Sequence, residues 1–145
     1  MIEQTLSIVK PDAVERNLES RIKSFFEKKN LKIIKSKKVQ ISKEEASEFY
    51  KIHQTKPFYN DLCNYLSSGP IIVMILEGEE AISKNRQIMG ATDPSKAEEG
   101  TLRKMYGLSI DKNSVHGSDS NESAKAEIFF FLLTSYLNEH LIASG

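Results

Sequence analysis

The sequence is poor in cysteine and has no tryptophan, no net charge and no long apolar run. Cys63 is the only cysteine in 145 residues, which excludes an internal disulfide and predicts a reducing compartment. No apolar run approaches the roughly 20 residues that a membrane-spanning helix needs. The first residues contain no basic segment followed by an apolar one, as a secretory leader would. These absences predict a cytoplasmic protein that does not enter a membrane.

Positive and negative charges balance, with 20 lysines and arginines against 20 aspartates and glutamates. No overall field therefore attracts nucleic acid or an anionic membrane, and a charged substrate has to be held by local groups. The length suits a single domain, residues 1–145, whose core needs no disulfide or metal. His53, His116 and His140 lack the spacing of zinc ligands, so we predict no metal site built from protein groups.

Three apolar segments have the character of β-strands. A short, partly β-branched run predicts a strand at 5–10. Residues 31–41 predict a strand near a sheet edge, in which Lys35 and Lys37 interrupt the alternation and indicate a twist or bulge. The continuous apolar run 71–76 predicts a central strand buried on both faces.

Between these strands lie segments with helical spacing of apolar residues. Ser42 and Glu45 form a capping-box pattern, and the apolar face behind them runs through Phe49 and Tyr50 to His53. Further helices are expected at 18–29, from Pro57 and at 122–137. Another is expected after a turn at Glu77-Gly78, with apolar positions that include Ala81, Ile82, Ile88 and Met89. Strands that alternate with helices, interrupted by one helix pair, predict an α+β sandwich in which helices cover a sheet.

The segment 90–113 is long and polar, with no sustained periodicity. Loops of this length in compact domains are usually disordered or functional, and Thr92, Arg103 and the flanking Arg86 favour a binding loop. The chain has no Gly-x-x-x-x-Gly-Lys-Ser/Thr segment, so side chains rather than a P-loop would have to hold phosphates. Lys10, Arg86 and Arg103, with the Thr92 hydroxyl, could supply those groups. The alternative for each is a solvated surface charge.

A polar turn at 113–120 places an imidazole among hydroxyls and a carboxylate. It reads Asn113-Ser114-Val115-His116-Gly117-Ser118-Asp119-Ser120. Neutral imidazole is a good nucleophile, so His116 could take a phosphoryl or acyl group and pass it on, unless it is an ordinary capping or surface histidine. Gly117 is expected to leave room for a bulky anionic group beside the ring and to permit the unusual dihedrals of a tight turn.

Glu127 is the second informative carboxylate, because it falls on the apolar face of the helix predicted after His116. It could accept a proton from one ring nitrogen and so leave the other nitrogen its lone pair for attack on phosphorus. Ser118 could assist by hydrogen bonding near the ring or Glu127. The alternative for Glu127 is an ion pair with a lysine such as Lys125 or Lys10.

The histidine turn resembles the active-site signature of the nucleoside diphosphate kinases, in which an asparagine precedes the histidine by three residues and Gly-Ser-Asp-Ser follows it. Further segments match the same family in order along nearly the whole chain. They are Ser7-Ile8-Val9-Lys10-Pro11-Asp12-Ala13-Val14, Lys56-Pro57-Phe58, Ser68-Gly69-Pro70, Arg86-Gln87-Ile88-Met89-Gly90-Ala91-Thr92 and Gly100-Thr101-Leu102-Arg103.

The resemblance implies a ferredoxin-like fold with a four-stranded antiparallel sheet, and a kinase that moves the γ-phosphoryl group of a nucleoside triphosphate to a nucleoside diphosphate by a ping-pong route through phospho-His116. It implies that Glu127 orients the ring and that Asn113 contacts the sugar and the transferring end. Phosphate contacts are implied for Lys10, Arg86, Thr92 and Arg103. Phe58 would stack on the base with Leu62 alongside, although its spacing alone is that of a core residue.

Magnesium is expected to arrive with the nucleotide rather than in a protein cage. The resemblance also implies a homo-oligomer, a tetramer or hexamer. The rival function is a non-catalytic nucleotide- or nucleic-acid-binding regulatory module of the same fold, for which the lysine-rich stretch 28–43 is the best support. That stretch lacks the interleaved aromatic residues of a single-strand binder, so nucleic acid is not expected as the primary partner.

The chain departs from the usual family pattern in places. Asp93 stands where asparagine is common, Ala97-Glu98-Glu99-Gly100 lacks a frequent proline, and the glycines often found before the first long helix are absent around 17–20. Neither of the first two departures touches the chemistry, but both could change the stiffness of the loop. The absent glycines could alter the contact between that turn and its surroundings.

Overall fold

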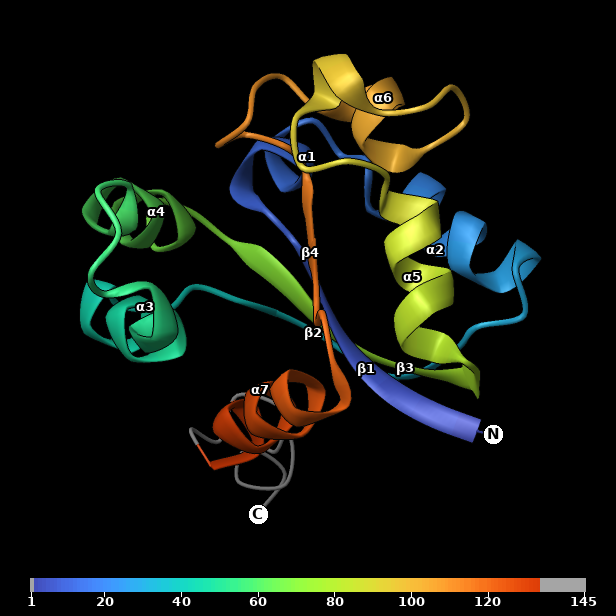
Figure 1. The fold of residues 1–145 in the computed structure, drawn as a ribbon, viewed down its shortest axis with the longest axis horizontal. Coiled ribbons are helices and arrows are strands. Elements are labelled where there is room, and N and C mark those ends of the chain that lie inside the picture. The colour runs from blue at the N-terminus through green and yellow to red at the C-terminus, as the bar shows by residue number, and fades with distance from the viewer. Residues whose placement is uncertain (1, 134–145) are drawn as a thin grey trace.

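The computed structural model describes residues 2–133, which form a four-stranded antiparallel sheet covered by helices (Figure 1). The strands are β1 (Ile2–Val9), β2 (Lys32–Val39), β3 (Ile71–Glu79) and β4 (Val115–Gly117). Their order in the sheet is β2-β3-β1-β4, the arrangement of a ferredoxin-like core. This confirms the predicted α+β sandwich.

The central strand β3 is buried from Ile71 to Leu76, as its continuous apolar run predicts. The strand does not turn at Glu77-Gly78, because β1 continues the ladder as far as the pair Ile2 and Glu79. The turn comes at Glu80, whose φ of 48° is left-handed. The predicted end of this strand was therefore wrong by a few residues, since pairing with β1 sets it rather than local sequence.

Strand β2 lies at the edge of the sheet and carries the predicted irregularity, a register shift against β3 between Ile33 and Lys35. Both predictions for this strand are confirmed. Its exposed lysines suit an edge, because charged side chains discourage further strand pairing.

Helices cover both faces of the sheet (Figure 1). One core cluster lies under α1 (Pro11–Glu15), α2 (Glu19–Lys28) and α5 (Ala81–Met89). The other lies under α3 (Lys43–Phe49), α4 (Tyr59–Leu66) and α7 (Asn121–Leu133). Residues alternate along β1, so that Leu6 and Ile8 join the second cluster and Val9 the first.

Several helix boundaries differ from the prediction. The short α1 was not predicted, and Asn17, with φ 59°, takes the left-handed turn between α1 and α2 where a glycine is often found. The capping box of Ser42 and Glu45 is confirmed at α3, but that helix ends at Phe49 and His53 lies in a 3-10 turn, Lys51–His53. Pro57 precedes α4 rather than opening it.

The segment 90–113 is not structureless, since it contains a 3-10 turn, Pro94–Lys96, and α6, Leu102–Tyr106. Both are short and capped by the side chains of Asp93 and Thr101, which periodicity over a long window cannot detect. The last residues of the predicted helix 122–137 lie outside the described residues. Within residues 2–133, no helix is long and apolar enough to cross a membrane.

Candidate active site

His116 stands on the short strand β4, where it pairs with Ile8 of β1. Val115 is fully buried in the core under α5, so the alternation of the strand turns His116 toward α3 and α7. Its ring lies 5.3 Å from the ring of Phe49, edge to face, and 6.3 Å from that of Tyr50. These contacts restrict the imidazole while about 18% of its side chain stays exposed. Sequence reasoning missed Phe49 as a ring contact, although its place on the apolar face of α3 was recognised.

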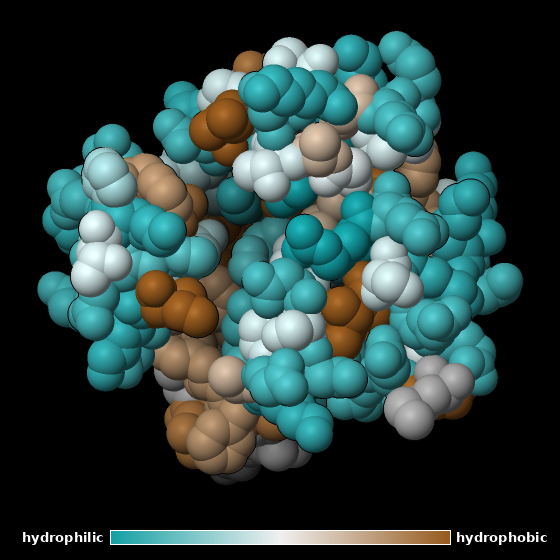
Figure 2. Space-filling model, in the orientation of Figure 1, coloured by the Kyte–Doolittle hydropathy of each residue, from teal (hydrophilic) through white to brown (hydrophobic). Residues whose placement is uncertain are grey.

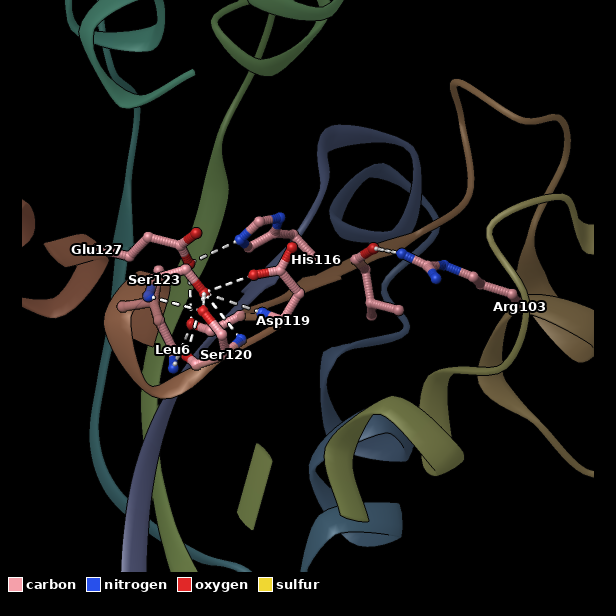
Figure 3. A network of polar contacts seen from close by, with 9 residues as sticks. Leu6, Arg103, His116, Asp119, Ser120, Ser123 and Glu127 are labelled. Atoms are coloured by element: carbon pink, nitrogen blue, oxygen red, sulfur yellow. Dashed lines mark hydrogen bonds and ion pairs between the residues drawn. The ribbon is translucent and has the colours of Figure 1, made fainter. Parts of the chain in front are cut away.

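Glu127 of α7 lies against the ring, with its Oε1 2.9 Å from His116 Nε2 (Figure 3). The same oxygen accepts a hydrogen bond of 2.9 Å from the Ser118 hydroxyl, and that hydroxyl accepts one from the Leu6 backbone N–H at 3.2 Å. An ionised carboxylate only accepts, so it selects the tautomer with the proton on Nε2 and the lone pair on Nδ1. Within the described residues Glu127 thus bonds His116 and Ser118 rather than a lysine.

The start of α7 is held by a cluster of hydroxyls beside this pair (Figure 3). Ser123 Oγ donates to Asp119 Oδ1 at 2.7 Å and accepts from the backbone N–H groups of Asp119 and Ser120. Ser120 Oγ in turn accepts from the Ser123 N–H at 3.1 Å. These bonds cap the helix and fix the first turns of α7, on which Glu127 is carried.

Gly117 does not leave room for a substrate, contrary to the prediction. A Cβ at this position would lie 2.3 Å from Asn85 Nδ2 and 2.7 Å from Met89 Cε, so the missing side chain admits α5. Nor is its backbone left-handed; the residue of the turn with positive φ is Ser114, at 77°. The prediction failed because the neighbour that fills the space comes from a distant helix.

Lys10 directly follows β1 and is buried beside the histidine turn. Its Nζ donates to Asn113 Oδ1 at 2.9 Å, and Asn113 Nδ2 donates to the Thr92 carbonyl at 3.0 Å. Burial, and then the charge of Arg103, lower the pKa of Lys10 to about 8, although Asp12 and Asp111 act in the opposite direction. Lys10 is thus a desolvated ammonium group that an anionic ligand would stabilise.

Arg103 of α6 is also buried, and it joins the loop to β4. Its Nη1 donates to the Gly90 carbonyl at 3.0 Å and its Nη2 to the Val115 carbonyl at 2.9 Å. Burial, followed by the charge of Arg86, lowers the pKa of Arg103 to about 10, while Tyr50 raises it. An anion bound near Arg86 and Arg103 would offset this repulsion between their charges.

The other sequence-predicted residues lie around this centre. Arg86 and Thr92 are exposed, on α5 and on the loop that follows it. Phe58, just before α4, is 45% exposed and contacts the His53 ring at 5.9 Å, so it is not the core residue that spacing alone suggests. Leu62 is half-buried against the second core cluster. Tyr50 is buried, and burial together with the charge of Glu127 raises its pKa.

The molecule is hollowed between the pair α3–α4 and the loop that contains α6, and hydrophilic side chains line much of the hollow (Figure 2). A groove of about 1070 Å³ runs along α1, α4 and residues 108–112. Asp12, Arg16 and Tyr65 are among its lining residues, whereas His116 is not. This groove is therefore not the space beside the His116 ring, whose side chain is about 18% exposed.

Comparisons with known proteins agree with this geometry. The family model described as "Nucleoside diphosphate kinase" matches residues 3–136. The nucleoside diphosphate kinase of Persephonella marina is 56% identical over 130 residues, which are 90% of this chain and 93% of the relative. Nucleoside diphosphate kinase 1 of Protochlamydia amoebophila is 57% identical over 129 residues, 89% of this chain and 92% of the relative.

Solved structures agree as well. The Aquifex aeolicus nucleoside diphosphate kinase superposes with a TM-score of 0.88 and 40% identity, covering 90% of this chain and 95% of the other. A Halobacterium salinarum nucleoside diphosphate kinase in complex with CDP has a TM-score of 0.87 and 40% identity, covering 90% of this chain and 88% of the other.

Proposed function

Because the chain belongs to the nucleoside diphosphate kinase family and transfers the γ-phosphoryl group of a nucleoside triphosphate to a nucleoside diphosphate, we propose that His116 carries the phosphoryl group between them. The observation that supports this role is the 2.9 Å contact between His116 Nε2 and Glu127 Oε1. It leaves Nδ1 as the nucleophilic atom. Donor and acceptor are chemically alike, so one pocket serves both in a ping-pong cycle.

In the first half-reaction the Nδ1 lone pair attacks the γ-phosphorus. The new bond joins Nδ1 to phosphorus, and the bond between phosphorus and the bridging oxygen breaks, so that its electron pair leaves with the nucleoside diphosphate. The charge of the imidazolium is stabilised by Glu127, which Ser118 holds in place. The second nucleoside diphosphate then reverses these steps.

Phosphoryl transfer needs mainly positioning and charge neutralisation. We propose that Lys10, Arg86 and Arg103 neutralise the phosphate charge, with the Thr92 hydroxyl as an additional hydrogen-bond donor. Asn113 is assigned to the sugar and the transferring end, and its contact with Lys10 Nζ at 2.9 Å supports a shared role. Desolvated cations act more strongly on phosphate than exposed ones, and Lys10 and Arg103 are the buried ones among these cations.

The base is assigned to a platform of Phe58 and Leu62. An aromatic face stacks on any base without reading its hydrogen-bonding edge, so we propose low base specificity. The exposure of Phe58 supports its use as a stacking surface, and the complex of the Halobacterium salinarum relative with CDP supports a nucleotide as the ligand of this fold.

Magnesium enters this proposal as part of the substrate. The described residues contain no group of three or more histidine, cysteine, aspartate or glutamate side chains that could hold an ion. A hard cation that keeps its waters and binds phosphate oxygens fits such a site. We therefore propose the magnesium complex of the nucleoside triphosphate as the form that binds.

We also propose that residues 1–145 make one domain, that the chain forms a tetramer or hexamer, and that it is cytoplasmic. The family match over residues 3–136 supports the first proposal, and a single cysteine supports the last. The rival function as a non-catalytic binding module gains no support from these relatives, because the names they carry are those of kinases. The lysines of β2 are explained equally well as protection of a sheet edge.

The test is to incubate the protein with γ-labelled ATP and magnesium, isolate it, and add unlabelled GDP. An acid-labile label that leaves as GTP is expected for the wild type and for His53→Ala, the matched control, and none for His116→Ala. Labelling of His116→Ala, or nucleotide binding by the wild type without any label, would reject the proposal.

A further inference from the structure

A buried carboxylate behind the histidine turn has no role in the chemistry described above. Asp12 lies on α1, two residues after Lys10, and its side chain is 3% exposed. Its Oδ2 accepts hydrogen bonds from the Ser114 hydroxyl at 2.9 Å and from Arg16 Nη2 at 3.0 Å. Its Oδ1 accepts one from the Tyr65 hydroxyl. Both oxygens are thus engaged, by three side chains: Ser114, Arg16 and Tyr65.

The partner Ser114 has a strained backbone, with a φ of 77°. Such a conformation persists in a residue other than glycine only when its surroundings hold it there. Three contacts do so here: the Lys10 backbone N–H donates to the Ser114 carbonyl at 2.8 Å, the Ser114 hydroxyl donates to Asp12, and that hydroxyl accepts from Arg16 Nη2 at 3.3 Å. The carboxylate of Asp12 is therefore part of what keeps this turn in place.

The two neighbours of Ser114 belong to the transfer site. Asn113 accepts a hydrogen bond from Lys10 Nζ, and the Val115 carbonyl accepts one from Arg103 Nη2. Val115 is followed directly by His116. A change in the backbone at Ser114 would therefore displace a cation contact on one side and the nucleophile on the other.

The remaining contacts of Asp12 reach further elements. Arg16 Nη2 also donates to the carbonyl of Tyr106 at the end of α6, at 2.6 Å. Tyr65 belongs to α4, whose first turn follows Phe58, and its hydroxyl accepts from the Asp12 backbone N–H at 2.9 Å. Asp12 therefore connects the element next to the base platform with the turn next to the phosphates.

We infer that Asp12 is a positioning residue for phosphoryl transfer, which holds the Ser114 turn and thereby places Lys10, Asn113 and His116 relative to one another. This inference rests on the proposed role of His116. Asp12 touches none of the reacting atoms and acts through Ser114.

The charge of Asp12 gives the role a signature that simple stabilisation lacks. The charged groups that act on Lys10 are Arg103 from α6, Asp111 from the loop, and Asp12 itself. The pKa of Lys10 is about 8, and the negative charge of Asp12 keeps it from being lower still. Removing its negative charge lowers that pKa further, so the fall in activity at alkaline pH moves to lower pH. Removing only the Ser114 hydroxyl leaves the charges, and the position of that fall, unchanged.

The experiment measures the single-turnover rate of His116 phosphorylation by magnesium ATP against pH, in the wild type, Asp12→Asn, Ser114→Ala and Asp61→Asn. Asp61 is the matched control, an exposed aspartate that lines the same groove. We expect Asp12→Asn to be slower by about tenfold or more, with its alkaline fall at lower pH. Ser114→Ala is expected to be slower, but its rate should fall at the same alkaline pH as that of the wild type. Asp61→Asn should match the wild type in both respects.

Thermal melting establishes that each variant is folded, and if Asp12→Asn does not fold, Ser114→Ala decides the question alone. Wild-type rates and an unmoved alkaline fall in the folded variants would overturn the inference. The inference would also be overturned if Asp12→Asn were slow with the pH profile of the wild type while Ser114→Ala reacted at the wild-type rate. Absence of phosphohistidine in the wild type would instead reject the proposed function, and this inference with it.

Discussion

Replacing Glu127 by glutamine tests how much the contact with His116 contributes to transfer. The carboxylate oxygen Oε1 accepts from both His116 Nε2 and the Ser118 hydroxyl, each at 2.9 Å. The amide of glutamine has one oxygen and no negative charge, so it cannot stabilise the imidazolium that forms as phosphorus is attacked. A hydrogen bond to a charged group contributes roughly 1.5–3 kcal/mol, which predicts a phosphorylation rate lower by about 10- to 150-fold.

The assay is a single turnover with γ-labelled ATP, quenched in alkali and quantified as phosphohistidine. Glu122→Gln is the matched control, since Glu122 is an exposed glutamate in the first turn of the same helix. We expect it to react at the wild-type rate and both variants to melt cooperatively. A folded Glu127→Gln that phosphorylates as fast as the wild type would refute the orienting role of Glu127.

Further expectations follow from other contacts of the site. Activity, measured as kcat/KM, should fall as pH rises through about 8, because Lys10 then loses the proton that gives it a positive charge to bind phosphate. An active Lys10→Arg variant should lack this fall, because arginine keeps its charge. Gly117→Ala should lower stability by ~1–3 kcal/mol and the melting temperature by about 3–10 °C, because its Cβ would lie 2.3 Å from Asn85 Nδ2; an unchanged melting curve would contradict the packing. Phe58→Ala should raise KM by roughly 5- to 150-fold for purine and pyrimidine nucleotides alike, with little change in kcat, if stacking supplies about 1–3 kcal/mol; a selective loss for one base would contradict a non-specific platform.

Local sequence predicted those parts of the fold that local forces determine. The capping box at Ser42 and Glu45, the buried central strand and the irregularity of the edge strand each depend on a few neighbouring residues, and all are present. The end of β3 at Glu79 was missed because pairing with β1 decides it. Helix α6 was missed because Leu102 and Arg103 are buried by distant partners rather than by a periodic pattern.

The candidate site likewise has parts that the sequence predicted and parts that it did not. The resemblance named residues that the fold does bring together, among them Lys10 with Asn113 and His116 with Glu127. It did not indicate that α5 fills the space beside Gly117, because that contact joins residues far apart in the chain. Asp12 was present in a recognised motif, but its partner Ser114 lies 102 positions away, and no spacing rule connects them.

Identifying the nitrogen atom that carries the phosphoryl group is the most direct test of the catalytic role of His116. The protein, labelled with ¹⁵N in histidine, is phosphorylated with magnesium ATP and examined by phosphorus–nitrogen correlation NMR at alkaline pH, with His116→Ala as the control. Since Glu127 engages Nε2, phosphorus should couple to Nδ1 of His116. Coupling to Nε2, a phosphate on another residue, or no phosphoprotein at all would contradict the proposal that Nδ1 of His116 carries the phosphoryl group.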